Sequence, residues 1–236
     1  MIESPDAGDR WTFAAILPGS SYVHTVHSGP RNQEEAQVFT EQIKEHGDGE
    51  APFFESDGWF YEEVLSEVYS TLEAVPYKGR GRKPHPKRVV DPKLKYAQLI
   101  KHREGGKVIK TSPRIVLGDE LEILEILDAS SCSSTISTSF VESRNGAFRK
   151  DNKRQTRKTK CHSKKIAPHD AHVIFLKGVY NLTKENERFR ILINPNAKRF
   201  ETKYKKVSPA MKQGLVKKIY PLQELLLMKP LMMTID

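Results

Sequence analysis

Residues 10–29, RWTFAAILPGSSYVHTVHSG, have the pattern of a β-hairpin, and this hairpin is the first element of the predicted fold. Strand-forming residues precede the turn Pro-Gly-Ser-Ser at 18–21, and more of them follow it. The next segment, 32–46, has the periodicity of an amphipathic helix and begins with a suitable cap, Asn32. This beginning predicts a two-stranded hairpin with a helix packed against it.

The order of the following segments extends this hairpin into a larger domain. A short apolar strand is predicted at 52–54, and a helix from Trp59 to about Leu72. The succession strand, strand, helix, strand, helix is typical of an α/β domain with mixed strand pairing. Residues 76–93, which are rich in Pro, Gly and basic residues, are expected to lack regular structure.

The second half of the chain alternates predicted elements with polar loops. A hairpin is expected over 94–117, with its turn at Gly105-Gly106. The further expectations are an acidic helix at 119–128, a Ser/Thr-rich loop at 130–139, a helix within the basic segment that follows, a helix at 169–182, and helical signals between 209 and 227.

Composition and charge narrow the class of protein. The chain has 236 residues, which is enough for one sizeable domain with appendages, and a formal net charge of +9. No run of about 18 apolar residues predicts a membrane span, and the acidic, polar N-terminus is unlike a secretory signal. Two distant cysteines favour a reduced, cytoplasmic protein. Clustered positive charge points to a polyanion, with nucleic acid first.

Most of that charge lies in residues 136–165, ISTSFVESRNGAFRKDNKRQTRKTKCHSKK. From Glu142 to Lys165 about ten basic residues stand against two acidic ones. On a helix, Glu142, Asn145, Arg149 and Lys153 fall near one face. The predicted DNA contacts in this segment are Asn145, Arg149, Lys153, Arg154, Arg157, Lys158, Lys164 and Lys165. The alternative for this segment is a solvated basic face or a disordered tail that binds no DNA. The basic loop at 76–93 is either a second DNA contact or a flexible linker.

Two carboxylates are candidate metal ligands. Asp57 follows an apolar strand and precedes a Gly-Trp turn, a position at which α/β folds present reactive groups. Glu142 begins the basic segment. Oxygen ligands of this kind hold the Mg²⁺ ions that act in phosphoryl transfer. The plainer alternatives are that Asp57 caps a helix and that Glu142 interacts with a helix dipole.

Three motifs resemble the DDE transposases of insertion sequences, of the insertion-sequence-one type. They are FFESDGWFYEEVL at 53–65, TSFVESRNGAFRKDNKRQTRKTKCHSKK at 138–165, and SPAMKQGLVKKIYPLQELL at 208–226. The resemblance implies a ribonuclease-H-like mixed β-sheet flanked by helices. It also implies a triad of two aspartates and a glutamate that holds two Mg²⁺ ions, with Mn²⁺ as a substitute, and that cuts and rejoins DNA.

Carried over by position, the family's second acid matches Asp57 and its third acid matches Glu142, while Asn145 and Arg149 match polar and basic positions on the same helix. Ser143 departs from the usual arginine. The family's first aspartate lies on a strand ahead of the opening hairpin, and that strand is absent here. A truncated copy is therefore expected; the alternative is an inactive DNA-binding remnant. A basic RNA-binding protein is a weaker alternative, because aromatic RNA-binding motifs are lacking.

The resemblance also organises the expected domains and partners. A catalytic core is predicted over 1–185, with the loop and hairpin at about 76–118 inserted in it, and a C-terminal helical tail over 186–236. The expected partners are insertion-sequence ends and target DNA, with a homo-oligomer on DNA left open and no membrane. The expected location is cytoplasmic, associated with the nucleoid of a prokaryote.

Overall fold

The computed structural model describes residues 10–57, 61–77, 79, 82–156 and 160–228. Within them the larger elements are β1 (Trp11–Leu17), β2 (Tyr22–Gly29), α1 (Gln33–His46), β3 (Phe53–Ser56), α2 (Tyr61–Val68), β4 (Ser70–Glu73), β5 (Lys87–Val90), β6 (Lys95–Glu104), β7 (Lys107–Leu117), α3 (Glu120–Ala129), α4 (Ser139–Asp151) and α5 (Ile166–Thr183). The C-terminal part adds the short elements β8 (Ile191–Leu192), β9 (Tyr204–Lys205), α6 (Pro209–Lys212) and α7 (Leu222–Leu227). No helix of the described part is long and apolar enough to cross a membrane.

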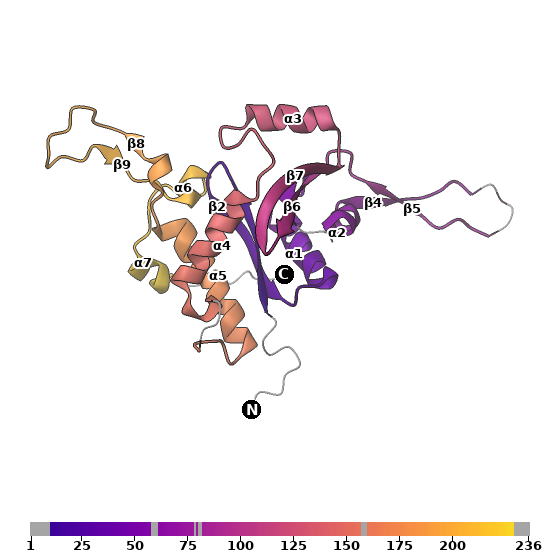
Figure 1. The fold of residues 1–236 in the computed structure, drawn as a ribbon, viewed down its shortest axis with the longest axis horizontal. Coiled ribbons are helices and arrows are strands. Elements are labelled where there is room, and N and C mark those ends of the chain that lie inside the picture. Colours follow the sequence, from indigo (N-terminus) through magenta and orange to yellow (C-terminus); the bar gives the residue numbers. More distant parts are fainter. Residues whose placement is uncertain (1–9, 58–60, 78, 80–81, 157–159, 229–236) are drawn as a thin grey trace.

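The architecture is mixed α/β and is built on several small sheets (Figure 1). β1 pairs antiparallel with β2. β3 pairs parallel with β6, which in turn pairs antiparallel with β7. The predicted mixed pairing is therefore confirmed. Instead of one continuous sheet, the described strands form the pair β1-β2 and the triple β3-β6-β7, with helices packed around them.

The opening hairpin and its helix form as predicted. Ser21 makes the turn with a φ of 53°, and Asn32 caps α1 by accepting a hydrogen bond from the Glu35 backbone N–H at 2.9 Å. The helix presents Ala36, Phe39 and Ile43 to Phe13 of β1 in one buried cluster. Because β1 alternates its side chains between two faces, its other face is free to pack elsewhere.

That other face meets the second half of the chain. Val23 and Val26 of β2 cluster with Phe148 of α4 and with Val173 and Tyr180 of α5, while Ala14 and Ile16 of β1 pack on the same group. A side-chain amide secures this contact. Asn181 is 3% exposed; its Oδ1 accepts from the Val23 N–H at 3.0 Å, and its Nδ2 donates to the Val23 carbonyl at 2.8 Å. The basic helix α4 is therefore anchored on the opening hairpin.

Two expectations about the region after α2 are corrected. The helix predicted to reach Leu72 ends at Val68, and Ser70–Glu73 is strand β4. The supposedly irregular stretch at 76–93 contributes β5, which pairs antiparallel with β4. Cross-strand pairing of the β-branched residues at 89 and 90 outweighs the helical periodicity of 69–72. The two strands form an arm that projects from the body of the protein (Figure 1).

Two further boundaries in the basic segment are corrected. α4 ends at Asp151, and Asn152 turns the chain by donating its N–H to the Phe148 carbonyl at 2.8 Å. Lys153 and Arg154 consequently belong to a separate short 3₁₀ turn, Lys153–Gln155, and do not continue the helix. The next helix, α5, begins at Ile166, earlier than the predicted start at 169. The other predicted elements, the hairpin at 94–117 and the acidic helix at 119–128, agree with β6, β7 and α3.

A candidate carboxylate centre and its basic flank

Asp57 and Glu142, far apart in sequence, share a single cation. The ammonium group of Lys101 donates to Asp57 Oδ2 at 2.9 Å and forms a short hydrogen bond with Glu142 Oε1. The Lys101 side chain is 15% exposed, whereas the two carboxylates are 55% and 54% exposed. The lysine therefore lies beneath two acids that remain open to solvent. We call Asp57, Lys101 and Glu142 the carboxylate centre.

Strand pairing positions two members of the carboxylate centre. β3 and β6 run parallel with Ser56 opposite Gln98. Asp57 therefore follows directly after β3, at the edge where Lys101 extends from the longer neighbour β6. Strands that run parallel end on the same side of a sheet, so the strand-end acid and the lysine come together without help from local sequence.

The first turn of α4 positions the third member. The Glu142 N–H donates to the Thr138 carbonyl at 3.0 Å, and the Thr138 hydroxyl donates to Glu142 Oε1 at 2.8 Å. The loop before the helix is tied to β3, because the Ser137 N–H donates to Glu55 Oε1 at 3.1 Å. These bonds hold the start of α4 against the end of β3, and the carboxylate of Glu142 faces Asp57 across Lys101.

Hydrogen bonding shifts the protonation equilibria of this centre. The hydrogen bond from Lys101 is the main cause that lowers the pKa of Glu142 below its ordinary value, and the bond from Thr138 acts in the same direction. Burial lowers the pKa of Lys101, but its bonds to Glu142 and Asp57 outweigh burial and leave that pKa raised. Near neutral pH the centre therefore holds a charged lysine and a charged Glu142.

The donor set fits a divalent cation only in part. Two carboxylates that reach one ammonium group could also reach one hard cation, since Mg²⁺ prefers carboxylate oxygens. Within the described residues, however, no group of three or more His, Cys, Asp or Glu side chains is arranged to hold a metal. Asp57 and Glu142 are therefore candidate ligands that leave most of a metal's coordination to water or to a substrate.

The predicted DNA-contact residues divide into two groups. Asn145 lies on α4 beside Glu142 and lines the cavity described below. The basic residues occupy the far end of α4 and the turns after it, and all of those described are exposed: Arg149, Lys153, Arg154, Lys164 and Lys165. Arg157 and Lys158 lie outside the described residues. We call the five described residues the basic flank.

The basic flank differs from other charged residues of the segment in having no acidic partner. None of its five side chains forms a salt bridge within the described part of the chain. Arg144, by contrast, lies 3.6 Å over the ring of Tyr180, and burial lowers its pKa. Arg144 is therefore a packing residue, whereas the flank presents uncompensated charge to solvent.

Sequence reasoning did not single out Lys101. It lies on an alternating strand among other basic residues, Lys95, His102 and Arg103, and nothing local distinguishes it. Its importance comes from the register of β6 against β3 and from the approach of α4, both of which are long-range. Thr138 was also missed, although its place just before a predicted helix is a usual position for a side chain that binds the first turn.

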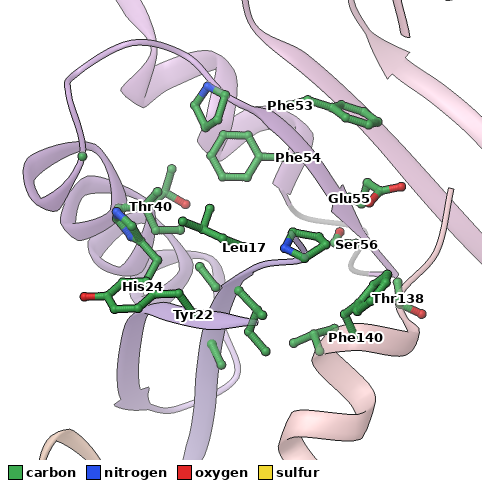
Figure 2. A pocket seen from close by; sticks show the side chains of 18 of the residues that line it. Leu17, Tyr22, His24, Thr40, Phe53, Phe54, Glu55, Ser56, Thr138 and Phe140 are labelled. Atoms are coloured by element: carbon green, nitrogen blue, oxygen red, sulfur yellow. The ribbon is translucent and has the colours of Figure 1, made fainter. Parts of the chain in front are cut away.

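A cavity of about 1410 Å³ opens beside this centre. Every residue of β1 and of β3 contributes to its lining, together with residues of α1, α4 and the loop before α4. Figure 2 shows Phe53 and Phe54 of β3, Leu17 of β1, and Phe140 of α4 around this space. Asp57 and Glu142 are at its margin, so the cavity and the carboxylate centre are continuous.

Comparisons of the chain with family models, with curated proteins and with solved structures find no match. Any assignment of function therefore rests on the motifs of this chain and on the geometry of its carboxylate centre and basic flank.

Proposed function

We propose that this protein acts on DNA as a relative of the insertion-sequence DDE transposases, through a Mg²⁺-binding centre at Asp57 and Glu142. The observation that carries the proposal is that both carboxylates contact Lys101. The three transposase-like motifs predict that these two acids cooperate, although 84 positions separate residues 57 and 142 in the numbering.

The charge around the centre supports a phosphodiester as the substrate. Asn145 follows Glu142 by one turn of α4, and Arg149 follows by another. Beyond Arg149, Lys153 and Arg154 continue the exposed positive charge. A nucleic-acid backbone lying along this line would meet cations on α4 while one phosphate reached the carboxylate centre.

The residues of the carboxylate centre and of the basic flank would have different roles in DNA cleavage. Asp57 and Glu142 would hold the metal ion, which when bound polarises a phosphodiester and activates water. Lys101 would leave its position between the acids, or move within it, as the divalent ion enters, because one cation excludes another from the same oxygens. The basic flank would bind the backbone and orient it. After cleavage, the freed 3′-hydroxyl would attack target DNA in a second step, strand transfer.

An inactive DNA-binding protein is the second candidate function. The observation that favours it is the small number of acids at the centre: among the described residues, no group of three potential ligands forms there. Under this candidate the basic flank binds DNA and the carboxylate centre only stabilises the start of α4.

A nicking assay on supercoiled plasmid with Mg²⁺ or Mn²⁺ separates the two candidates. The wild-type chain is compared with Asp57→Asn, Glu142→Gln and the control Glu125→Gln, which removes an exposed acid of α3 away from the centre. Metal-dependent nicking that is lost by at least about a hundredfold in the first two variants, and kept in the control, supports the proposal. DNA binding without any nicking supports the inactive protein. Absence of both rejects the two together.

A further inference from the structure

The cavity between β1 and β3 is bounded by one edge of each strand, and no described strand pairs with either edge. β1 is hydrogen-bonded to β2 on one side, and β3 to β6 on one side. Among the described strands none pairs with the other edge of either. All residues of Trp11–Leu17 and of Phe53–Ser56 line the space between them. Backbone N–H and C=O groups on these edges need partners when water is excluded.

The two faces of this space are closed by helices. Phe13 and Ala15 of β1 pack toward α1, whereas Ala14 and Ile16 pack toward α4 and α5. The cavity lining accordingly includes Phe39 and Ile43 of α1 and Phe140 and Val141 of α4. A strand in this space would be covered on both faces. Such strands are apolar along their whole length.

The two edges belong to sheets of different pairing. β1 is antiparallel to its neighbour β2, whereas β3 is parallel to its neighbour β6. An added strand can pair with either kind of edge, because parallel and antiparallel pairs occur together in mixed sheets.

One end of the space carries an unneutralised lysine. Lys177 of α5 lines the cavity beside Tyr22 and His24, at the Leu17 end of β1. Burial lowers the pKa of Lys177, and no salt bridge of this residue occurs in the described part of the chain. A carboxylate entering at this end would supply the missing counter-charge.

We propose that the cavity between β1 and β3 is a strand-addition site, which binds an extended apolar segment of another polypeptide that carries a carboxylate at the Lys177 end. The lengths of β3 and β1 set the bound segment at four to seven residues. Main-chain hydrogen bonds to both edges would provide affinity, and the helices α1 and α4 would select apolar side chains. This binding of a polypeptide is proposed without reference to metal or DNA, although the cavity borders the carboxylate centre.

A separate polypeptide fits this site better than a second copy of the chain. The apolar strands within the described residues are already paired, so a second copy would have to unpair one of its own strands to donate it. The loss of main-chain hydrogen bonds and buried side chains at the donor's own site offsets what the strand gains here. A strand that begins unpaired in another protein has no such cost.

The test uses short synthetic peptides of alternating valine and alanine, with an aspartate at one end and a lysine at the other, in both orders. Binding is measured by calorimetry, and amide hydrogen exchange is followed in β1 and β3 with and without peptide. We expect one order to bind and to slow exchange in both strands together. A matching peptide with a central proline should do neither. Protection of one strand only, or none with either order, overturns the proposal.

Two variants test the walls of the site. Val141→Glu places a charge on the α4 wall, and we expect it to weaken peptide binding by at least about tenfold. Val38→Glu, on an exposed part of α1 outside the cavity lining, is the control and should leave binding unchanged. Circular dichroism checks that both variants fold. Equal binding by the two variants places the peptide elsewhere and overturns the proposal.

Lys177→Met tests the charged end. We expect about fivefold weaker binding of the aspartate peptide and no change for the same peptide with asparagine. Equal losses for both peptides contradict the role given to Lys177. Two other occupants are excluded in the same experiment. If amide exchange in β1 and β3 is already slow without peptide and becomes faster on deletion of residues 229–236, the occupant is the chain's own C-terminus. If protection of these amides increases with protein concentration, the occupant is a second copy. Either result overturns the proposal.

Discussion

The carboxylate centre and the basic flank meet at α4, which carries Glu142 of the first and Arg149 of the second, yet they are built in opposite ways. Glu142 of the centre is held by hydrogen bonds from Lys101 and Thr138, and the loop before α4 is bonded to Glu55 of β3. The flank, from Arg149 onward, has exposed side chains without acidic partners among the described residues. A group that must meet a metal at fixed geometry requires positioning by its neighbours. A group that only neutralises phosphate can remain mobile in solvent.

Phe148 should produce the largest effect, because it anchors α4, the helix that carries Glu142 and Arg149. It is 7% exposed and packs on Val23 and Tyr180. Replacement by alanine leaves a cavity, so Phe148→Ala should lower the free energy of unfolding by about 3–5 kcal/mol. The control is Phe200→Ala, which removes a side chain that is 95% exposed and should cost less than about 0.5 kcal/mol. Urea denaturation of both variants measures the difference; equal stability would mean that α4 is not anchored here.

The basic flank should dominate DNA affinity and its dependence on salt. The triple variant Arg149→Gln, Lys153→Gln, Arg154→Gln should weaken binding by more than about tenfold at low salt. It should also make the slope of log K against log salt shallower by up to about 2.7, because three counterion-releasing contacts are lost. Fluorescence anisotropy over a salt series measures both quantities.

A second triple variant controls for the loss of net charge. Lys198→Gln, Arg199→Gln and Lys205→Gln remove the same charge from the β8–β9 region, which projects away from α4 (Figure 1). If the flank is the interface, this control should retain most of the affinity and nearly the whole slope. Equal losses in the two triples would show that only overall charge matters.

Lys101 should compete with divalent cations for the carboxylate centre. Lys101→Met removes the ammonium group from between Asp57 and Glu142, and like charges are then left facing each other. We expect about tenfold tighter Mn²⁺ binding, measured by electron paramagnetic resonance of the free ion. Lys107→Met, at the exposed start of β7, is the matched control. Unchanged Mn²⁺ affinity in Lys101→Met would remove the centre as a metal site.

The pH dependence of the centre should be the smallest effect. The pKa of Glu142 is lowered in the folded protein, chiefly by the hydrogen bond from Lys101. Its contribution to stability is therefore complete above the unfolded carboxyl pKa and is lost as pH falls through the lower folded value. Because the side chain is about half exposed, solvent screens the pair and the contribution stays below about 1 kcal/mol. Carbon NMR of the Glu142 carboxyl group measures the pKa; in Lys101→Met it should rise.

The elements with strong local signals were predicted well. The hairpin of β1 and β2 follows from alternating strand formers around a turn, and α1 follows from its apolar stripe and the Asn32 cap. The Gly105-Gly106 turn between β6 and β7 is equally local, since both glycines have positive φ. Strand pairing between β4 and β5 overrode the local helical preference there. At the end of α4 the missed signal was local, since Asn152 caps the turn that follows.

The residues of the candidate site also differ in whether local sequence or long-range contacts reveal them. Asp57 and Glu142 were predicted from their motifs as metal ligands; both contact Lys101, and their role as ligands stays a prediction. Lys101 was not predicted, because its role depends on the register between two strands that are separated by 38 positions. Arg144 looked like one more basic residue of the 136–165 segment, but it is partly buried and packs on the ring of Tyr180.

The sequence by itself determined the types of the elements with strong local signals, the concentration of positive charge after Glu142 and the choice of two candidate acids. These properties depend on residues within a few positions of one another, so periodicity and composition reveal them. Tertiary structure alone decided that a lysine of β6 joins the two acids, and that the edges of β1 and β3 face each other across an open cavity. Such arrangements arise from contacts between distant segments, for which a single sequence carries no local pattern.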